Sequence, residues 1–328
     1  MAVQSRHFEN IAGPLNILDL RHFTARDLRP LLEAEAREWD AQLQWDYSGS
    51  AEMILRYADS RILPGYAVLD DGRVSGYAFF VYEGNKAVVG DVYALPHPVL
   101  PPATLQLRLL DHVLETLQQT PGITRIEAQL LLHESPELAT PFLTRDFAQF
   151  RRLFMTTSVE TTGVFGAIKS IPGMKVRRWT EQDFQPAAAL ITKAYAGHVD
   201  SKINDQYRSA AGSMRFLNNI VRFPGCGNFD PSSSFVVIDE ARNVMAGLLL
   251  CSRVRKDVAH ITQVCLLPEY RRRGLGKLLI AVCADELSTR DMKSLTLTVS
   301  EENTSAVALY EQLGFSTERL FDAFVWER

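Results

Sequence analysis

A short run in the second half of the chain combines arginines and glycines at a spacing that suits phosphate binding. It follows an apolar, strand-like stretch that ends at Pro268, and it consists of Arg271, Arg272, Arg273, Gly274, Leu275, Gly276 and Lys277. Glycines let a ligand approach the backbone closely, and the N–H groups at the start of a helix attract anions. Arginines add charge-assisted hydrogen bonds to phosphate oxygens. The run therefore predicts a pyrophosphate-binding loop, and the alternative is a solvated basic turn at a helix start.

Two common phosphate-binding loops are excluded because this run lacks residues that they require. The Walker A pattern needs Ser or Thr directly after its Lys, whereas Leu278 follows Lys277 here, and no glycine stands five residues before Gly276. The dinucleotide-binding fingerprint needs a third glycine at the position that Leu279 occupies. The ligand is therefore expected to be a different pyrophosphate compound.

A second motif follows the loop at some distance. Leu295–Val299 reads as a strand, and after it come Asn303, Ala306, Leu309, Tyr310, Gly314 and Phe315. Together the two motifs resemble those of the GNAT superfamily of N-acetyltransferases, whose acyl-CoA loop reads Q/R-x-x-G-x-G/A. The resemblance covers residues 174–328 most strongly.

The resemblance implies a co-substrate and a reaction. It implies acetyl-CoA with no metal, and direct transfer of the acetyl group to a primary amine within a ternary complex. Residues expected to contact the pantetheine arm and the thioester are Val264, Cys265 and Leu266, the residues from Arg271 to Lys277 form the pyrophosphate loop, and Asn303 contacts the co-substrate. Because the family forms no covalent enzyme intermediate, Cys265 is not expected to act as a nucleophile.

Acetyl transfer also needs an acid for the departing thiolate. The resemblance assigns this role to Tyr310, and the alternative is a core aromatic ring whose hydroxyl is hydrogen-bonded nearby. The residue that takes the proton of the amine stays open. The strand before the loop carries no carboxylate, so the candidates are His260 on that strand, Glu301 just beyond the neighbouring strand, and a water relay.

The two halves of the chain repeat one pattern. Leu20–Pro30 aligns with Val176–Pro186 at an offset of 156 residues, and in both copies a Thr stands three positions before an Asp, as at a helix start. The strand Val88–Leu95 aligns with His260–Leu267 at an offset of 172 residues. Four such matches in the same order predict two copies of one topology.

The first copy lacks the residues of both motifs. At the corresponding offsets Pro102 stands opposite Gly274, and Phe142 stands opposite Tyr310. Prolines remove the backbone donors that a pyrophosphate loop needs. The first half is therefore expected not to bind CoA, and to pack against the second half and shape its substrate cleft.

These patterns predict an α/β (α+β layered) fold class with two tandem GNAT folds, each a mixed, mostly antiparallel sheet flanked by helices. The expected division is a degenerate domain at residues 1–158, a linker at 159–173 and a catalytic domain at 174–328. This tandem arrangement is similar to that of mycothiol synthase.

Composition narrows the class of function further. Hydrophobic residues make up 46% of the 328 and the net charge is −4, which is typical of a globular protein and argues against a nucleic-acid partner. The four cysteines form no C-x-x-C pair, and no stretch reaches the length of a membrane span. We therefore expect a cytoplasmic N-acetyltransferase with a small-molecule amine as acceptor. Alternatives are a non-catalytic acyl-CoA sensor, a different acyl-CoA donor and a protein acceptor.

Overall fold

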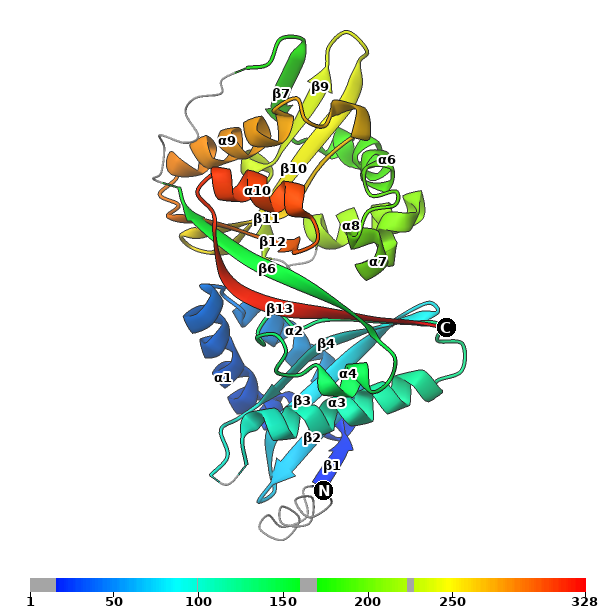
Figure 1. Cartoon of the computed structure of the whole chain (residues 1–328). Helices are drawn as coiled ribbons and strands as arrows, with labels where there is room; N and C mark the ends of the chain where they lie inside the picture. Colours follow the sequence, from blue (N-terminus) through cyan, green and yellow to red (C-terminus); the bar gives the residue numbers. More distant parts are fainter. Residues whose placement is uncertain (1–15, 99, 160–169, 223–226) are drawn as a thin grey trace, which may run out of the picture. The chain divides into compact units, whose positions relative to one another are not determined.

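The computed structural model describes residues 16–98, 100–159, 170–222 and 227–328, and these form two compact units (Figure 1). The first unit comprises Met1–Leu43, Tyr47–Gln149 and Phe321–Arg328, and the second comprises Gln44–Asp46 and Phe150–Leu320.

The first unit combines helices with an antiparallel run of strands. In chain order its described elements are β1 (Asn16–Asp19), α1 (Ala25–Leu43), α2 (Ser48–Asp59), β2 (Gly65–Asp70), β3 (Arg73–Glu83), β4 (Lys86–Ala94), α3 (Pro102–Gln119), β5 (Arg125–Gln129) and α4 (Thr140–Leu143). The strands β1 to β4 pair in antiparallel succession, and β4 pairs with β5 in parallel. The helix α3 packs on β2, β3 and β4.

The second unit repeats this order. Its described elements are β7 (Met174–Arg178), α6 (Phe184–Ala194), α7 (Asp200–Ile203), α8 (Ala210–Arg222), β8 (Asn228–Phe229), β9 (Phe235–Asp239), β10 (Val244–Arg255), β11 (Val258–Leu266), α9 (Leu275–Ser288), β12 (Ser294–Ser300) and α10 (Thr304–Gln312). The strands β7, β9, β10 and β11 pair in antiparallel order, and β11 pairs with β12 in parallel. These sheets confirm the predicted mixed, mostly antiparallel fold class.

A shared irregularity shows that the repeat is structural. In β4 the register against β3 skips Gly90, and in β11 the register against β10 skips Thr262. These two residues stand at the offset of 172 that the sequence gives for this pair of strands. A β-bulge bends its strand and increases the local twist. Each unit therefore bends the corresponding strand at the corresponding residue.

Two further strands have residues in both units and so depart from the predicted domain boundaries. The strand β6 (Ala148–Ser158) pairs with β12 in the second unit, and β13 (Ser316–Glu327) pairs through Ala323–Glu327 with β5 in the first unit. The strand β6 thus joins the sheet of the second unit although it follows first-unit residues in the sequence. The strand β13 joins the sheet of the first unit although it follows second-unit residues. Most of the predicted linker at 159–173 lies outside the described residues.

The start of α6 follows the capping chemistry that the sequence predicts. Thr180 and Asp183 form a reciprocal capping box, in which the Thr180 backbone N–H and hydroxyl both donate to the Asp183 carboxylate, at 2.8 and 3.0 Å. Thr24 and Asp27 repeat these contacts before α1. The segment before Thr24, Leu20–His22, is a short 3-10 turn, and the Asp19 carboxylate accepts its Arg21 backbone N–H at 2.9 Å.

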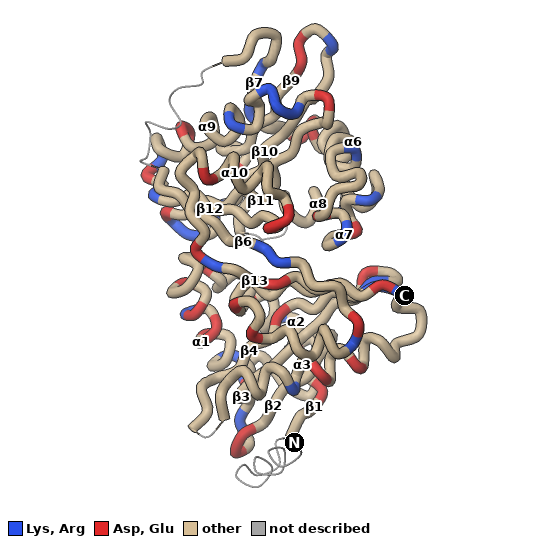
Figure 2. Tube along the Cα trace, viewed as in Figure 1, with Lys and Arg blue, Asp and Glu red and all other residues tan. Residues whose placement is uncertain are grey.

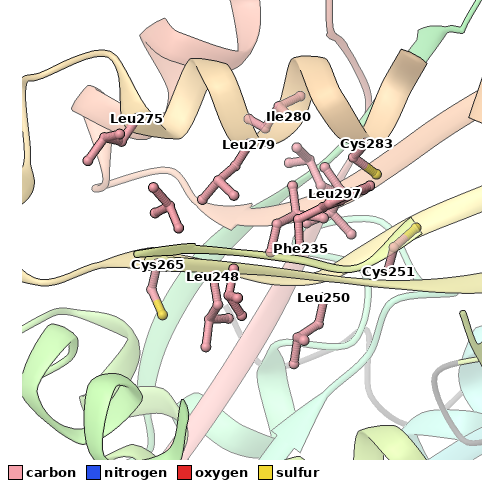
Figure 3. Close-up of a cluster of buried hydrophobic side chains, with 14 of the residues drawn as sticks. Phe235, Leu248, Leu250, Cys251, Cys265, Leu275, Leu279, Ile280, Cys283 and Leu297 are labelled. Carbon is pink, nitrogen blue, oxygen red and sulfur yellow. The ribbon is translucent and has the colours of Figure 1, made fainter. Parts of the chain in front are cut away.

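The helix α9 covers one face of the sheet in the second unit (Figure 3). Its apolar residues Leu275, Leu279 and Cys283 recur every four positions, so they share one side of the helix and are fully buried against the strands. Burial of one such leucine contributes about 1.5–3 kcal/mol. In the same view Leu248 and Cys265 point to the opposite face of the sheet. The core therefore fixes the position of the first turn of α9 on this sheet.

Charged residues are interspersed along the trace, and Figure 2 shows no long basic stripe in the view drawn. Within the described ranges, no helix is both long enough and apolar enough to cross a membrane. The expected cytoplasmic location and the expected lack of a nucleic-acid partner stay predictions.

Candidate active site

The candidate site lies where β11 and β12 separate. Their parallel pairing covers Val258–Ile261 and Ser294–Leu297, and the described strands then run on without pairing to each other. One edge of β11 continues to pair with β10 as far as Leu266, so its other edge carries backbone groups without a strand partner. An extended ligand can hydrogen-bond to such an edge.

The last residues of β11 are those that the sequence assigns to the pantetheine arm. Val264 and Leu266 are partly exposed, whereas Cys265 is buried. Burial raises the pKa of the Cys265 thiol well above its ordinary value. A thiol that stays protonated is a poor nucleophile, which agrees with the expectation that Cys265 forms no covalent intermediate.

The predicted pyrophosphate loop has the backbone geometry of an anion site. Arg272 and Gly274 both have left-handed backbone conformations, with φ of 62° and 80°, and α9 begins at the next residue, Leu275. The first helical hydrogen bond runs from the Leu278 N–H to the Gly274 carbonyl. The N–H groups of the first turn are therefore free to bind an anion, as at other helix starts.

The three arginines of the loop differ in their surroundings. Arg271 is bound to the protein itself: its Nη2 donates to the Ala194 carbonyl at 2.5 Å and its Nε to the Leu266 carbonyl at 3.4 Å. The Arg273 guanidinium lies over the Tyr270 ring, 5.1 Å from the ring centroid. Arg272 makes no ion pair with any described residue. We infer that Arg271 fixes the loop, and that Arg272 is better placed than Arg271 to reach a phosphate.

This difference gives a first prediction. The double change Arg272→Ala with Lys277→Ala is expected to weaken CoA binding by tenfold or more, since hydrogen bonds to charged groups contribute about 1.5–3 kcal/mol. Arg271→Ala is expected to lower the melting temperature. Calorimetric titration with CoA and thermal melts separate the two effects, with the exposed Arg26→Ala in α1 as the control. Unchanged CoA affinity in the double variant would remove the loop from the site.

Two further motif residues, Gly276 and Asn303, lie beside α10. A Cβ built on Gly276 would lie 3.3 Å from Leu309 Cδ2, so a larger residue here would require the Leu309 side chain to shift by a few tenths of an ångström. Asn303 precedes α10, and its side chain accepts the Ala306 N–H at 3.4 Å and the Ser305 hydroxyl at 3.3 Å. The structure thus gives Asn303 a helix-capping role, and its contact with the co-substrate stays a prediction.

Tyr310 has the properties that a general acid needs. It lies in α10 and is 7% exposed, and its hydroxyl has no hydrogen-bond partner among the described residues. Burial, with a contribution from the negative charge of Asp200, raises the pKa of Tyr310 well above its ordinary value. The phenol therefore stays protonated. The alternative of a core ring with a hydrogen-bonded hydroxyl does not fit this arrangement.

The structure does not bring His260 to the site. Its Nδ1 lies 2.8 Å from the Thr296 hydroxyl, within the part of β11 that still pairs with β12. The imidazole is in ring contact with Trp45 and Phe154. Burial lowers its pKa to about 3, so the ring is uncharged at neutral pH and weakly basic.

Glu301 follows β12 but extends toward solvent. Its side chain is 50% exposed, and its carboxylate lies 3.7 Å from the Arg151 guanidinium. His260 is thus buried and weakly basic, and Glu301 is half exposed beside a guanidinium, so the role of either as the base stays a prediction.

The structure places another carboxylate beside the end of β12. Asp200, the first residue of α7, accepts a hydrogen bond from the Ser300 hydroxyl at the end of β12. Nearby, the Tyr195 hydroxyl donates to Gln263 Oε1 at 3.3 Å. The local pattern gave no signal for these contacts, since Asp200 and Ser300 are a hundred residues apart.

The corresponding part of the first unit has a different character. The helix α3 begins at Pro102 and is preceded by Pro101, so its first turn offers fewer N–H groups than that of α9. Phe142 is fully buried and stacks on Phe324, with ring centroids 4.1 Å apart. The absence of CoA binding in this unit stays a prediction that these contacts support.

Known proteins resemble this chain in sequence over part of its length and in fold over most of it. The family model "Acetyltransferase (GNAT) family" matches residues 187–315. The chain is 42% identical over 65 residues to [ribosomal protein bS18]-alanine N-acetyltransferase of Salmonella typhimurium, covering 20% of this chain and 44% of that protein. It is 33% identical over 96 residues to mycothiol acetyltransferase of Thermobifida fusca, covering 26% of this chain and 29% of that protein. The chain thus spans less than half the length of these relatives.

Solved structures extend the likeness of fold to both units. A GCN5-related N-acetyltransferase from Sphaerobacter thermophilus superposes with a TM-score of 0.68 at 15% identity, covering 95% of each chain. A tandem GNAT protein from the clavulanic acid biosynthesis pathway superposes with a TM-score of 0.60 at 16% identity, covering 96% of this chain and 98% of that one. Residues 187–315 therefore match the GNAT acetyltransferase family model, and the chain has the fold of these two solved structures over nearly its whole length.

Proposed function

We propose that this protein transfers an acetyl group from acetyl-CoA to a primary amine, and that the second unit carries out the reaction. The observation that carries the proposal is the separation of β11 from β12 after Ile261 and Leu297, where their parallel pairing ends. Three features support it: an edge of β11 that has no strand partner among the described residues, the first-turn N–H groups of α9, and the protonated hydroxyl of Tyr310.

Acetyl-CoA supplies the thioester whose acyl group is transferred. The residues of the chain have three tasks in that reaction. The first turn of α9 and the loop before it hold the pyrophosphate by N–H groups and charge. The free edge of β11 aligns the pantetheine arm and donates to the thioester carbonyl, where negative charge develops. Tyr310 gives its proton to the departing thiolate.

The names of the relatives suggest acceptors for a first test. One relative acts on the alanine of ribosomal protein bS18 and others are mycothiol acetyltransferases. A peptide with an N-terminal alanine, glucosamine and spermidine together sample α-amino, amino-sugar and polyamine acceptors. Release of CoA and the mass of the product identify turnover.

A second prediction concerns the number of sites. Calorimetric titration is expected to give one acetyl-CoA per chain, because only the second unit has the glycine loop. Two sites per chain would overturn the assignment of the first unit. Binding with no turnover for any amine would favour the alternative of an acyl-CoA sensor.

A further inference from the structure

We propose that Asp200 is the carboxylate that binds the amino group of the acceptor and takes the proton released when that nitrogen is acylated. This inference rests on the proposed function, and it supplies the base that the strand β11 lacks.

One oxygen of Asp200 is held in place by its neighbours. Oδ1 accepts the hydroxyl of Ser300, and Arg152 Nη1 lies 3.7 Å from the same oxygen. Arg152 and Ser300 are direct cross-strand partners in β6 and β12, so they approach Asp200 from one side of the sheet. The guanidinium is too far for a good hydrogen bond. It balances the charge without occupying the carboxylate.

The other oxygen of Asp200 remains available to a ligand. Oδ2 accepts no hydrogen bond from the described residues. His198 Nδ1 lies 3.7 Å from it, but this nitrogen accepts the Asp200 backbone N–H at 3.1 Å and so has no proton to donate. The Asp200 side chain is 14% exposed, so part of it is in contact with solvent.

The groups around Asp200 are those that acyl transfer requires. Asp200 is close enough to the phenols of Tyr195 and Tyr310 for its charge to help raise the pKa of each, after the larger effect of burial. Tyr195 in turn holds Gln263 on β11. The Nε2 of Gln263 is buried with no hydrogen-bond partner among the described residues. An unpaired buried amide donor is costly, which indicates that a ligand completes it.

The lone pair of the neutral amine forms a C–N bond to the thioester carbon, and the positively charged nitrogen then gives one proton to Asp200 Oδ2. The carbonyl re-forms as the C–S bond breaks, and the thiolate takes the proton of Tyr310. Transfer of the proton from Asp200 to Tyr310 through water restores both residues, and the products are the amide and CoA.

Three variants of Asp200 test the role with the same three acceptor probes. Asp200→Asn keeps the size of the side chain, Asp200→Glu keeps the carboxylate, and Asp200→Ala leaves room for added formate. Asp291→Asn is the matched control, since this exposed residue after α9 has the same chemistry and a left-handed backbone that Asn tolerates. Calorimetry with acetyl-CoA and thermal melts accompany the kinetics and report on folding.

We expect Asp200→Asn to lower kcat by about 10²-fold, within the usual range for general base catalysis, with an unchanged KM for acetyl-CoA. Asp200→Glu is expected to keep part of the activity, and formate to raise turnover of Asp200→Ala. A residue with only a structural role would give no rescue by formate.

Two outcomes overturn the inference and differ from each other. If the wild-type protein turns over an acceptor and Asp200→Asn has the same kcat, the role of Asp200 is overturned and the proposed function stays intact. The same holds if the variants raise only the KM for the acceptor and formate gives no rescue. Failure of the wild-type protein to release CoA with every probe overturns both.

Discussion

Tyr310→Phe is expected to lower kcat by about 10²- to 10⁴-fold while leaving the affinity for acetyl-CoA unchanged. The substitution removes only the hydroxyl, and the ring keeps its contact with Phe315, whose centroid is 5.9 Å away. Since that hydroxyl has no hydrogen-bond partner among the described residues, its loss leaves no buried group unpaired. The effect should therefore fall on the chemical step and not on stability.

Steady-state kinetics with saturating acetyl-CoA measure this effect, and calorimetry gives the affinity. Tyr57→Phe is the matched control, because Tyr57 in α2 is 43% exposed and lies in the first unit. A donor whose leaving thiol is more acidic should narrow the difference between the wild type and Tyr310→Phe, since such a thiolate needs less help from an acid. Equal kcat in the two proteins would exclude Tyr310 as the acid.

The second large effect concerns a buried carboxyl pair in the first unit. Glu35 in α1 is fully buried, and its Oε2 accepts the Tyr77 hydroxyl at 2.8 Å. Its Oε1 has no hydrogen-bond donor among the described residues. The neighbouring Asp91 accepts the Val92 N–H at 2.8 Å and the Tyr47 hydroxyl at 3.3 Å. A proton on Glu35 that is donated to Asp91 satisfies both carboxyl groups.

Burial, then the charge of Asp91, raises the pKa of Glu35 well above its ordinary value of 4.5. The folded state therefore holds a proton that the unfolded chain releases at lower pH. The stability from protonated Glu35 is complete below about pH 4.5 and is lost as the pH rises through the folded pKa. Between about pH 4.5 and the folded pKa, the free energy of unfolding should fall by about 1.4 kcal/mol per pH unit from this group alone, and above the folded pKa the group adds no further dependence.

Glu35→Gln should remove this part of the pH dependence, because its amide donates to Asp91 without a titratable proton. Its melting temperature is expected to match that of the wild type below about pH 4.5, to exceed it increasingly as the pH rises from there to the folded pKa of Glu35, and to keep a constant excess above that pKa. Glu33→Gln is the control, since Glu33 is exposed on the same helix. Parallel profiles of melting temperature against pH for Glu35→Gln and wild type would contradict the shared proton.

Local chemistry explains why much of the second unit was predictable. The helix start at Gly274 and the capping box at Thr180 depend on residues within a few positions of one another, and the structure has both. Strand positions followed from runs of apolar residues, and the repeat fixed their order in both halves. The family resemblance then placed Tyr310, whose surroundings suit an acid.

Contacts between distant residues were not predictable in the same way. Arg271 seemed from its spacing to be a phosphate ligand, yet its guanidinium binds the carbonyl of Ala194, 77 residues away. His260 looked suitable as a base by residue type, but the pairing of β11 with β12 buries it among aromatic rings. Local periodicity carries no information on which rings or carbonyls will surround a side chain.

The sequence by itself determined the glycine loop, the tandem repeat and the absence of the loop in the first half, because each depends on residue types at short spacings. Only the tertiary structure decided which carboxylate lies beside the end of β12 and which strand completes the sheet of each unit. Asp200 meets Ser300, and β13 returns to β5, through contacts that close long loops. Such contacts are selected by packing of the whole unit, and they leave no mark in the sequence around either partner.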